Sequence, residues 1–194
     1  MSLPKFNPRS TALLIIVLLI GIMRFAFIWN NELSPLSNFS PVGAMAIFSG
    51  AYMSSAWKKF AFPLLTLFVS DLILSYTVHA EFRTGFLYGG WYWTYGAFAL
   101  MTLASTWLVK KVNMLSLLSA SVAAVFIHWI VTDLGVWWGS TMYAQTLRGY
   151  ILCLIAAIPF ELNLFAGTVL YGSILFGGFE LMQKKYPGLS LPNV

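Results

Sequence analysis

Four charged side chains interrupt long apolar runs of this sequence, and they are the residues best able to do chemistry. They are Arg24, Asp71, Asp133 and Glu161. Charges in membrane-spanning sequence are costly, so they usually face a protein interior or a watery cavity. Two interpretations stay open, because buried charges are also commonly paired. The four groups either tie helices together as structural ion pairs, or they line a ligand cavity.

The two histidines and the single cysteine are the other candidates for chemistry. His128 precedes Asp133 by five residues, which on a helix separates the two side chains by about 140°, so they do not form a dyad. His128 is either a hydrogen-bonded packing residue or a ligand-binding one. Cys153 excludes an intramolecular disulfide and is expected to be a small buried apolar residue. No phosphate loop, zinc spacing or Ser/His/Asp motif occurs.

The composition requires a membrane environment. Hydrophobic residues make up 59% of the 194 residues and charged residues only 9%, against about 25% charged in an average soluble domain. We therefore expect one integral membrane domain over residues 1–194. The net charge of +5 does not indicate nucleic-acid binding, because the lysines stand in short pairs between apolar runs.

The apolar runs predict an all-α protein with six transmembrane helices, since about 20 apolar residues cross the hydrocarbon layer. The expected spans are 11–29, 41–57, 59–76, 90–109, 115–138 and 160–182. Proline is tolerated at the first turn of a helix, so Pro41 is expected to start the second span. A short outer-side helix is expected over 147–158, ending before Pro159.

The basic residues predict the orientation of these spans. Only Arg83 and Arg148 fall on one face, Arg24 is inside a span, and the other eight fall on the face of the termini: Lys5, Arg9, Lys58, Lys59, Lys110, Lys111, Lys184 and Lys185. Cytoplasmic loops carry the excess of lysine and arginine. We therefore expect both termini in the cytoplasm and a bacterial cytoplasmic (inner) membrane location, with the acidic groups in the outward half.

Aromatic and small residues offer two further surfaces. Trp91, Trp93 and Trp137 lie in the outward segments, where tryptophan is common at membrane interfaces but where a flat ligand could also pack. Ala46 and Gly50 form a small-xxx-small pair, which lets helices approach closely. That pair either packs inside the bundle or docks another membrane protein.

Four short segments carry a family resemblance. They are Asn38-Phe39-Ser40-Pro41-Val42-Gly43-Ala44, Phe68-Val69-Ser70-Asp71-Leu72, Thr132-Asp133-Leu134-Gly135-Val136-Trp137 and Ala157-Ile158-Pro159-Phe160. With six spans in about 200 residues, the chain resembles the S components of energy-coupling-factor (ECF) vitamin transporters. It is most similar to the solitary cobalamin (BtuM-like) members and to a related group of small bacterial membrane proteins of uncharacterised function.

The resemblance implies a transport protein that captures a vitamin-like nutrient at its outer face, with cobalamin or another corrinoid as the first expectation. His79 lies in the third outer-side segment, where the solitary type has a cobalt-ligating cysteine, so the resemblance implies His79 as the metal ligand. No intrinsic cofactor is expected, and an ECF-type energising module could dock through Ala46/Gly50. The alternatives are a membrane-embedded enzyme with an outward acid–base site and a structural subunit. The expected ligand-binding residues are Arg24, Asn38, Asp71, His79, Trp91, Trp93, His128, Asp133, Trp137 and Glu161.

Overall fold

The computed structural model describes residues 11–13, 15, 16, 18, 19, 22, 38–77 and 80–189. These residues are almost entirely helical and include no β-strand, only one isolated bridge between Arg83 and Tyr88. The named helices are α2 (Val42–Tyr52), α3 (Ala56–Tyr76), α4 (Trp91–Leu108), α5 (Met114–Trp137) and α6 (Leu147–Lys185), with two 3-10 turns, η1 (Ala80–Phe82) and η2 (Pro187–Leu189). The expected all-α class is confirmed for this part of the chain.

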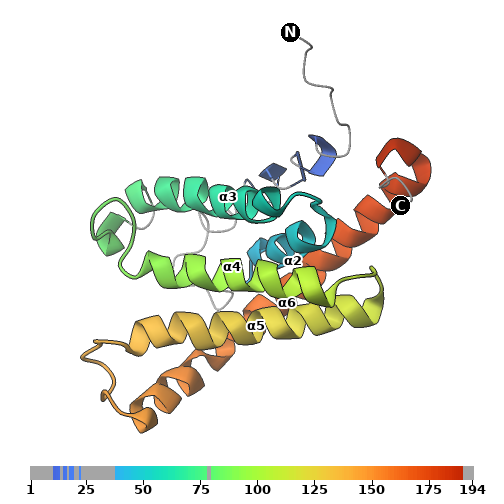
Figure 1. The fold of residues 1–194 in the computed structure, drawn as a ribbon. Coiled ribbons are helices and arrows are strands. Elements are labelled where there is room, and N and C mark those ends of the chain that lie inside the picture. The colour runs from blue at the N-terminus through green and yellow to red at the C-terminus, as the bar shows by residue number, and fades with distance from the viewer. Residues whose placement is uncertain are drawn as a thin grey trace.

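The helices run alternately up and down, and their lysine-bearing ends lie together. Figure 1 shows α3 and α5 starting, and α4 and α6 ending, at the same end of the bundle. The sequence puts a lysine pair at each of these points: Lys58-Lys59 in the first turn of α3, Lys110-Lys111 between α4 and α5, and Lys184-Lys185 in the last turn of α6. We call this end of the bundle the lysine end. The opposite end carries Arg83 and Arg148.

Local sequence signals fix several helix boundaries. Asn113 caps α5 through a capping box, in which its side chain accepts a hydrogen bond from the Ser116 backbone N–H and the Ser116 hydroxyl accepts one from Asn113. Thr146 caps α6 by accepting from the Gly149 N–H. Such caps satisfy backbone donors that a helix start leaves unpaired. Pro41 is the N-cap residue of α2, as expected to within one residue.

The short helix α2 forms the centre of the bundle and contacts α3, α4, α5 and α6. Ten of its 11 residues are buried. Phe48 and Tyr52 of α2 pack against Phe176 and Phe179 of α6, with ring centroids 4.6–5.6 Å apart. The core therefore lies around α2 and widens toward the lysine end.

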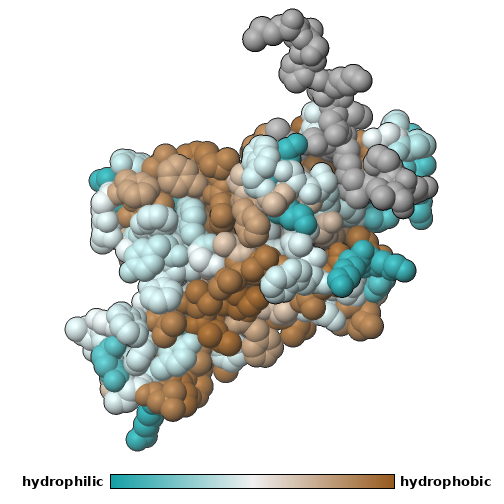
Figure 2. All heavy atoms as spheres, in the orientation of Figure 1, coloured by the Kyte–Doolittle hydropathy of each residue, from teal (hydrophilic) through white to brown (hydrophobic). Residues whose placement is uncertain are grey.

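The outer surface of the bundle is apolar over the lengths of its helices. α3, α5 and α6 are each long and apolar enough to cross a membrane, and only 22–33% of their most apolar stretches is buried inside the protein. Figure 2 shows brown, hydrophobic side chains across the middle of this face and hydrophilic ones toward its ends. Side chains such as Leu65, Trp107, Leu162 and Ile174 are exposed. Such a surface is suited to lipid, and the chain is a membrane protein.

Two expected elements differ from the observed ones. α6 is one helix of 39 residues that contains Pro159, where a short helix over 147–158 and a separate span from 160 were expected. Proline removes a backbone hydrogen bond from a helix interior, but apolar membrane helices tolerate it where neighbours compensate. Glu161 therefore lies about 21 Å along α6 from Leu147 at 1.5 Å per residue, and not at the start of a helix as expected.

The second expected span, 41–57, is also shorter in the structure. α2 ends at Tyr52, and Met53, Ser54 and Ser55 separate it from α3. With 11 residues it is about 16 Å long, roughly half of a 30 Å hydrocarbon layer. α2 is thus a half-length helix enclosed by the other helices.

The Ala46/Gly50 face of α2 packs inside the bundle. Ala46 is fully buried, and a Cβ atom added to Gly50 would lie 2.6 Å from the Thr102 carbonyl oxygen and 1.8 Å from Ser105 Oγ of α4. Glycine is needed at this position because the two backbones approach so closely. Of the two interpretations of this pair, internal packing is the one the contacts favour.

Candidate functional site

A polar cavity of about 320 Å³ lies where α2, α4, α5 and α6 meet, in the half of the bundle away from the lysine end. Its ionisable lining consists of His128 and Asp133 from α5, Glu161 from α6 and Tyr88 from the segment before α4. Most of the other lining residues are hydroxyl-bearing or apolar: Asn38, Ser40, Val42, Leu67, Thr94, Phe98, Thr132, Val136, Ala157, Phe160 and Leu164.

The antiparallel pairing of α5 and α6 brings the ionisable groups together. Tyr150 Oη donates to the Ile130 carbonyl at 2.8 Å, and Trp129 Nε1 donates to the Leu154 carbonyl at 2.9 Å. These hydrogen bonds fix the register of the two helices. In that register His128 Nδ1 lies 2.9 Å from Glu161 Oε1, although the two residues are 33 positions apart in sequence.

The His128–Glu161 pair is nearly enclosed, with side-chain exposures of 12% and 6%. The His128 ring also packs edge-on against Phe98 of α4. The second carboxylate oxygen, Glu161 Oε2, is buried and has no hydrogen-bond partner among the described residues. A buried carboxylate oxygen without a partner costs free energy, so this atom is available to a donor group from a ligand.

Asp133 lies on the same wall of the cavity and is also buried, at 7% exposure. Cys153 Sγ lies 3.7 Å from both the Asp133 carbonyl oxygen and Asp133 Oδ1, so the thiol is a weak donor to this carboxylate. Thr132 Oγ1 donates to the His128 carbonyl at 2.7 Å. Cys153 is buried as expected.

The half-length helix α2 begins at this cavity. Asn38 and Ser40 precede the helix, Val42 is its first residue, and all three line the cavity. Asn38 adopts a positive φ of 68°, a conformation that asparagine tolerates better than most residues. Non-helical backbone at membrane depth occurs where it lines a cavity. The positive end of α2 therefore lies at the same cavity as the acidic groups.

Among the described residues that line the cavity, acidic side chains outnumber basic ones. A helix N-terminus is equivalent to about +0.5 of an elementary charge, and His128 contributes at most one further positive charge. Asp133 and Glu161 contribute up to two negative charges, and no lysine or arginine is among the described residues that line the cavity. The N-terminus of α2 lowers the free-energy cost of burying the two carboxylates, but its partial charge is too small to neutralise both of them. The cavity thus suits a ligand that carries hydrogen-bond donors or a positive charge.

Asp71 lies beside the cavity and does not line it. Its Oδ2 accepts hydrogen bonds from Tyr95 Oη at 3.1 Å and Tyr88 Oη at 3.4 Å, and the carboxylate is buried at 2% exposure. Tyr88 is itself a lining residue. Asp71 is therefore a positioning residue that holds one wall of the cavity through a tyrosine hydroxyl.

A single comparison with known proteins identifies the family of the chain. Residues 4–189 match the model of DUF6580, a family of unknown function. The chain belongs to the DUF6580 family. No curated protein and no solved structure matches it.

Apart from Asp71, which lies beside the cavity, the predicted site residues of this DUF6580 protein fall into three groups. Asn38, His128, Asp133 and Glu161 come together at the cavity. Arg24 and His79 lie outside the described residues, so the expected pairing of Arg24 and the expected metal ligand have no structural account. Among the described residues no cluster of three histidine, cysteine or acidic side chains could hold a metal ion.

The three tryptophans expected to bind ligand form the third group, and none of them is a lining residue of the cavity. Trp91 packs against Phe86 and Tyr95, with ring centroids 5.5 and 5.2 Å apart. Trp93 packs against Gly135, and a Cβ atom there would lie 2.3 Å from the indole ring. Trp137 Nε1 donates to the Ala144 carbonyl. These contacts join Trp91 to the segment before α4, Trp93 to α5 and Trp137 to the loop before α6.

Sequence reasoning missed the hydroxyl groups of the cavity, namely Ser40, Tyr88, Thr94 and Thr132. Thr132 adjoins Asp133 and Ser40 lies two residues from Asn38, so neighbourhood to a predicted site residue was an available signal. Thr94 adjoins Trp93, another predicted site residue, whereas Tyr88 has no such neighbour. Only the packing of α4 against α5 brings Thr94 to the cavity.

Proposed function

We propose that this DUF6580 protein is a multi-pass protein of a bacterial cytoplasmic membrane that captures a small cationic nutrient in the cavity and passes it inward. The observation that carries the proposal is the buried pair of carboxylates, Asp133 and Glu161, which line one cavity without a lysine or arginine in its described lining. A buried carboxylate is stabilised by an opposite charge, and an organic ammonium ion would supply it.

The volume of the cavity limits the ligand. Ligand pockets commonly measure about 300–1,000 Å³, and this cavity of about 320 Å³ is at the small end of that range. A corrinoid, with its macrocycle and nucleotide arm, is much larger than this space. The proposal is therefore for a small amine or similar vitamin-like cation, in place of the cobalamin that the family resemblance implied.

The proposed topology has six membrane crossings with both termini in the cytoplasm. The lysine end, where α3 and α5 begin and α4 and α6 end, would face the cytoplasm under the positive-inside rule. Residues 11–29 would supply the first crossing and α2, with the segment before it, the second. The cavity would then be nearer the outer surface.

The half-length helix supports a transport function over a purely structural one. Transporters commonly bind substrate near the middle of the bilayer at the ends of interrupted helices. α2 has this form, because it begins at the cavity and ends near the lysine end after 11 residues. A structural subunit has no need for a cavity lined by acidic groups.

The His128–Glu161 pair also favours a second candidate, an enzyme with an acid–base step at the same cavity. A histidine held by a carboxylate 2.9 Å away is a common general base. An enzyme would convert the bound molecule, whereas a transport protein would release it unchanged. Mass analysis of a ligand recovered after incubation with the protein distinguishes the two.

Thermal unfolding in detergent tests the proposed binding. The melting temperature is measured against increasing ethylamine and against ethanol, its neutral isostere, at constant ionic strength and at a pH where the amine is charged. Binding to the native state raises the melting temperature, so ethylamine should raise it in a saturable way and ethanol should not. Asp133→Asn should abolish the ethylamine effect. An equal response to both compounds, or an undiminished response in Asp133→Asn, would contradict the proposal.

A further inference from the structure

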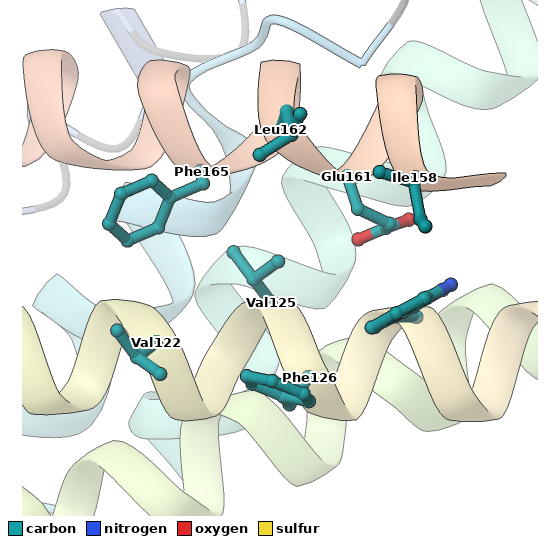
Figure 3. Close-up of a pocket in the computed structure, with 8 residues that line it drawn as sticks. Val122, Val125, Phe126, Ile158, Glu161, Leu162 and Phe165 are labelled. Atoms are coloured by element: carbon teal, nitrogen blue, oxygen red, sulfur yellow. The ribbon is translucent and has the colours of Figure 1, made fainter. Parts of the chain in front are cut away.

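A second hollow, of about 200 Å³, lies on the flank of the bundle between α5 and α6. Val122, Val125 and Phe126 line it from α5, and Ile158, Leu162 and Phe165 line it from α6. Figure 3 shows Val125 of α5 and Phe165 of α6 extending into the space between the two helices. We call this hollow the lateral groove.

Glu161 is shared by the lateral groove and the polar cavity, since it lines both. In Figure 3 its side chain projects from α6 toward α5 at one end of the groove. On the cavity side Oε1 binds His128, while Oε2 is buried and has no partner within the part of the chain that the structure describes. The Glu161 side chain therefore lies between an apolar groove and an acidic cavity.

The flank around the groove is lipid-facing. Phe126 and Leu162 are exposed at 52% and 63%, and they belong to two of the three helices that are apolar and long enough to span a membrane. Val125, at 9%, forms the floor. Acyl chains of the bilayer would surround this face, so a hydrocarbon tail could enter the groove without crossing water.

From this junction we propose that the site takes a single-chain amphiphilic amine, with its ammonium group at Glu161 and Asp133 and its alkyl tail in the lateral groove. The inference rests on the proposed function and specifies its ligand class. The ammonium N–H groups supply the donor that Glu161 Oε2 lacks, and the tail matches an apolar lining. Such a ligand would reach the cavity sideways from the bilayer.

The test compares octylamine with ethylamine on protein in phosphatidylcholine nanodiscs, using radiolabelled amines and subtracting binding to empty nanodiscs. Val122→Trp fills the groove at a lipid-exposed position, and Leu170→Trp, exposed on α6 but outside the groove, is the matched control. Comparing variant with wild type for each amine cancels the different partitioning of the two amines into lipid.

Val122→Trp should weaken octylamine binding by about tenfold, because a filled site resists an added group, and should leave ethylamine binding unchanged. Leu170→Trp should change neither, and Glu161→Gln should weaken both. Equal octylamine binding by wild type and Val122→Trp, with ethylamine still bound, would overturn the role of the groove and leave the proposed function standing. Failure of wild type to bind either amine would overturn both.

Discussion

Nδ1 of His128 lies 2.9 Å from Oε1 of Glu161, and this contact joins the middle of α5 to the middle of α6 within the membrane-spanning part of the bundle. It positions Glu161 between the cavity and the lateral groove, both of which this residue lines. The pair is therefore both a tie between two helices and one wall of the site.

The energetic coupling of this pair is the first prediction. A double-mutant cycle with His128→Gln and Glu161→Gln should give a coupling of about 1.5–3 kcal/mol in the free energy of unfolding, as expected for a buried hydrogen bond to a charged group. Unfolding in mixed SDS micelles measures it. Glu161→Gln with Glu180→Gln is the control, because Glu180 binds Tyr52 near the other end of α6, and their effects should add. A coupling below about 0.5 kcal/mol for His128 and Glu161 would contradict the pairing.

The packing of α2 against α4 gives the second prediction. Gly50→Val places side-chain atoms where Ser105 Oγ and the Thr102 carbonyl oxygen already lie, so the helices must separate. We expect a loss of about 2–4 kcal/mol in the free energy of unfolding, within the range of severe overpacking. Gly178→Val is the matched control, since nothing lies within 4 Å of a Cβ atom there. If the two variants unfold alike, the Gly50 face is not a packed interface and becomes available for docking.

Orientation is the third prediction, and it follows from the lysine end. In a Cys153→Ala background, Glu81→Cys should react with a membrane-impermeant thiol reagent added to intact cells, and Lys111→Cys should react only after the membrane is opened. Both side chains are exposed in the structure. The reverse pattern would place the lysine end outside, and the cavity would then open nearer the cytoplasm.

The helical class and the boundaries of α3, α4 and α5 could be predicted from apolar run length and from the flanking lysines, because both signals are local. The continuation of α6 through Pro159 could not be predicted. Proline usually ends a helix in a soluble protein but is tolerated in membrane helices, and the sequence around Pro159 does not show which of the two cases holds. The length of α2 was overestimated because Met53-Ser54-Ser55 is no more polar than many helical segments.

The site was predictable in its acidic residues but not in its geometry. Asp133 and Glu161 stand out in apolar sequence because they are costly there. The contact of His128 with Glu161 depends on how α5 and α6 are aligned against each other. The two residues are 33 positions apart in sequence, and no rule of sequence spacing predicts that alignment. His128 and Asp133 point in different directions on α5, as predicted, yet both line the cavity. The outward tryptophans could not be told apart in sequence from ligand-binding ones, and in the structure none of the three lines the cavity.

The most direct test of the central claim, an outward cavity that favours cations, is the rate at which a cysteine inside it reacts with charged reagents. Thr94→Cys places a thiol in the cavity lining, and Met142→Cys, 79% exposed in the loop before α6, is the reference, both in a Cys153→Ala background. An ammonium-bearing and a sulfonate-bearing methanethiosulfonate are added from outside. We predict that the ratio of cationic to anionic rates is at least about tenfold higher at residue 94 than at residue 142, and that Asp133→Asn with Glu161→Gln removes the difference. Equal ratios at the two positions, or reaction at residue 94 only from the lysine end, would contradict the account.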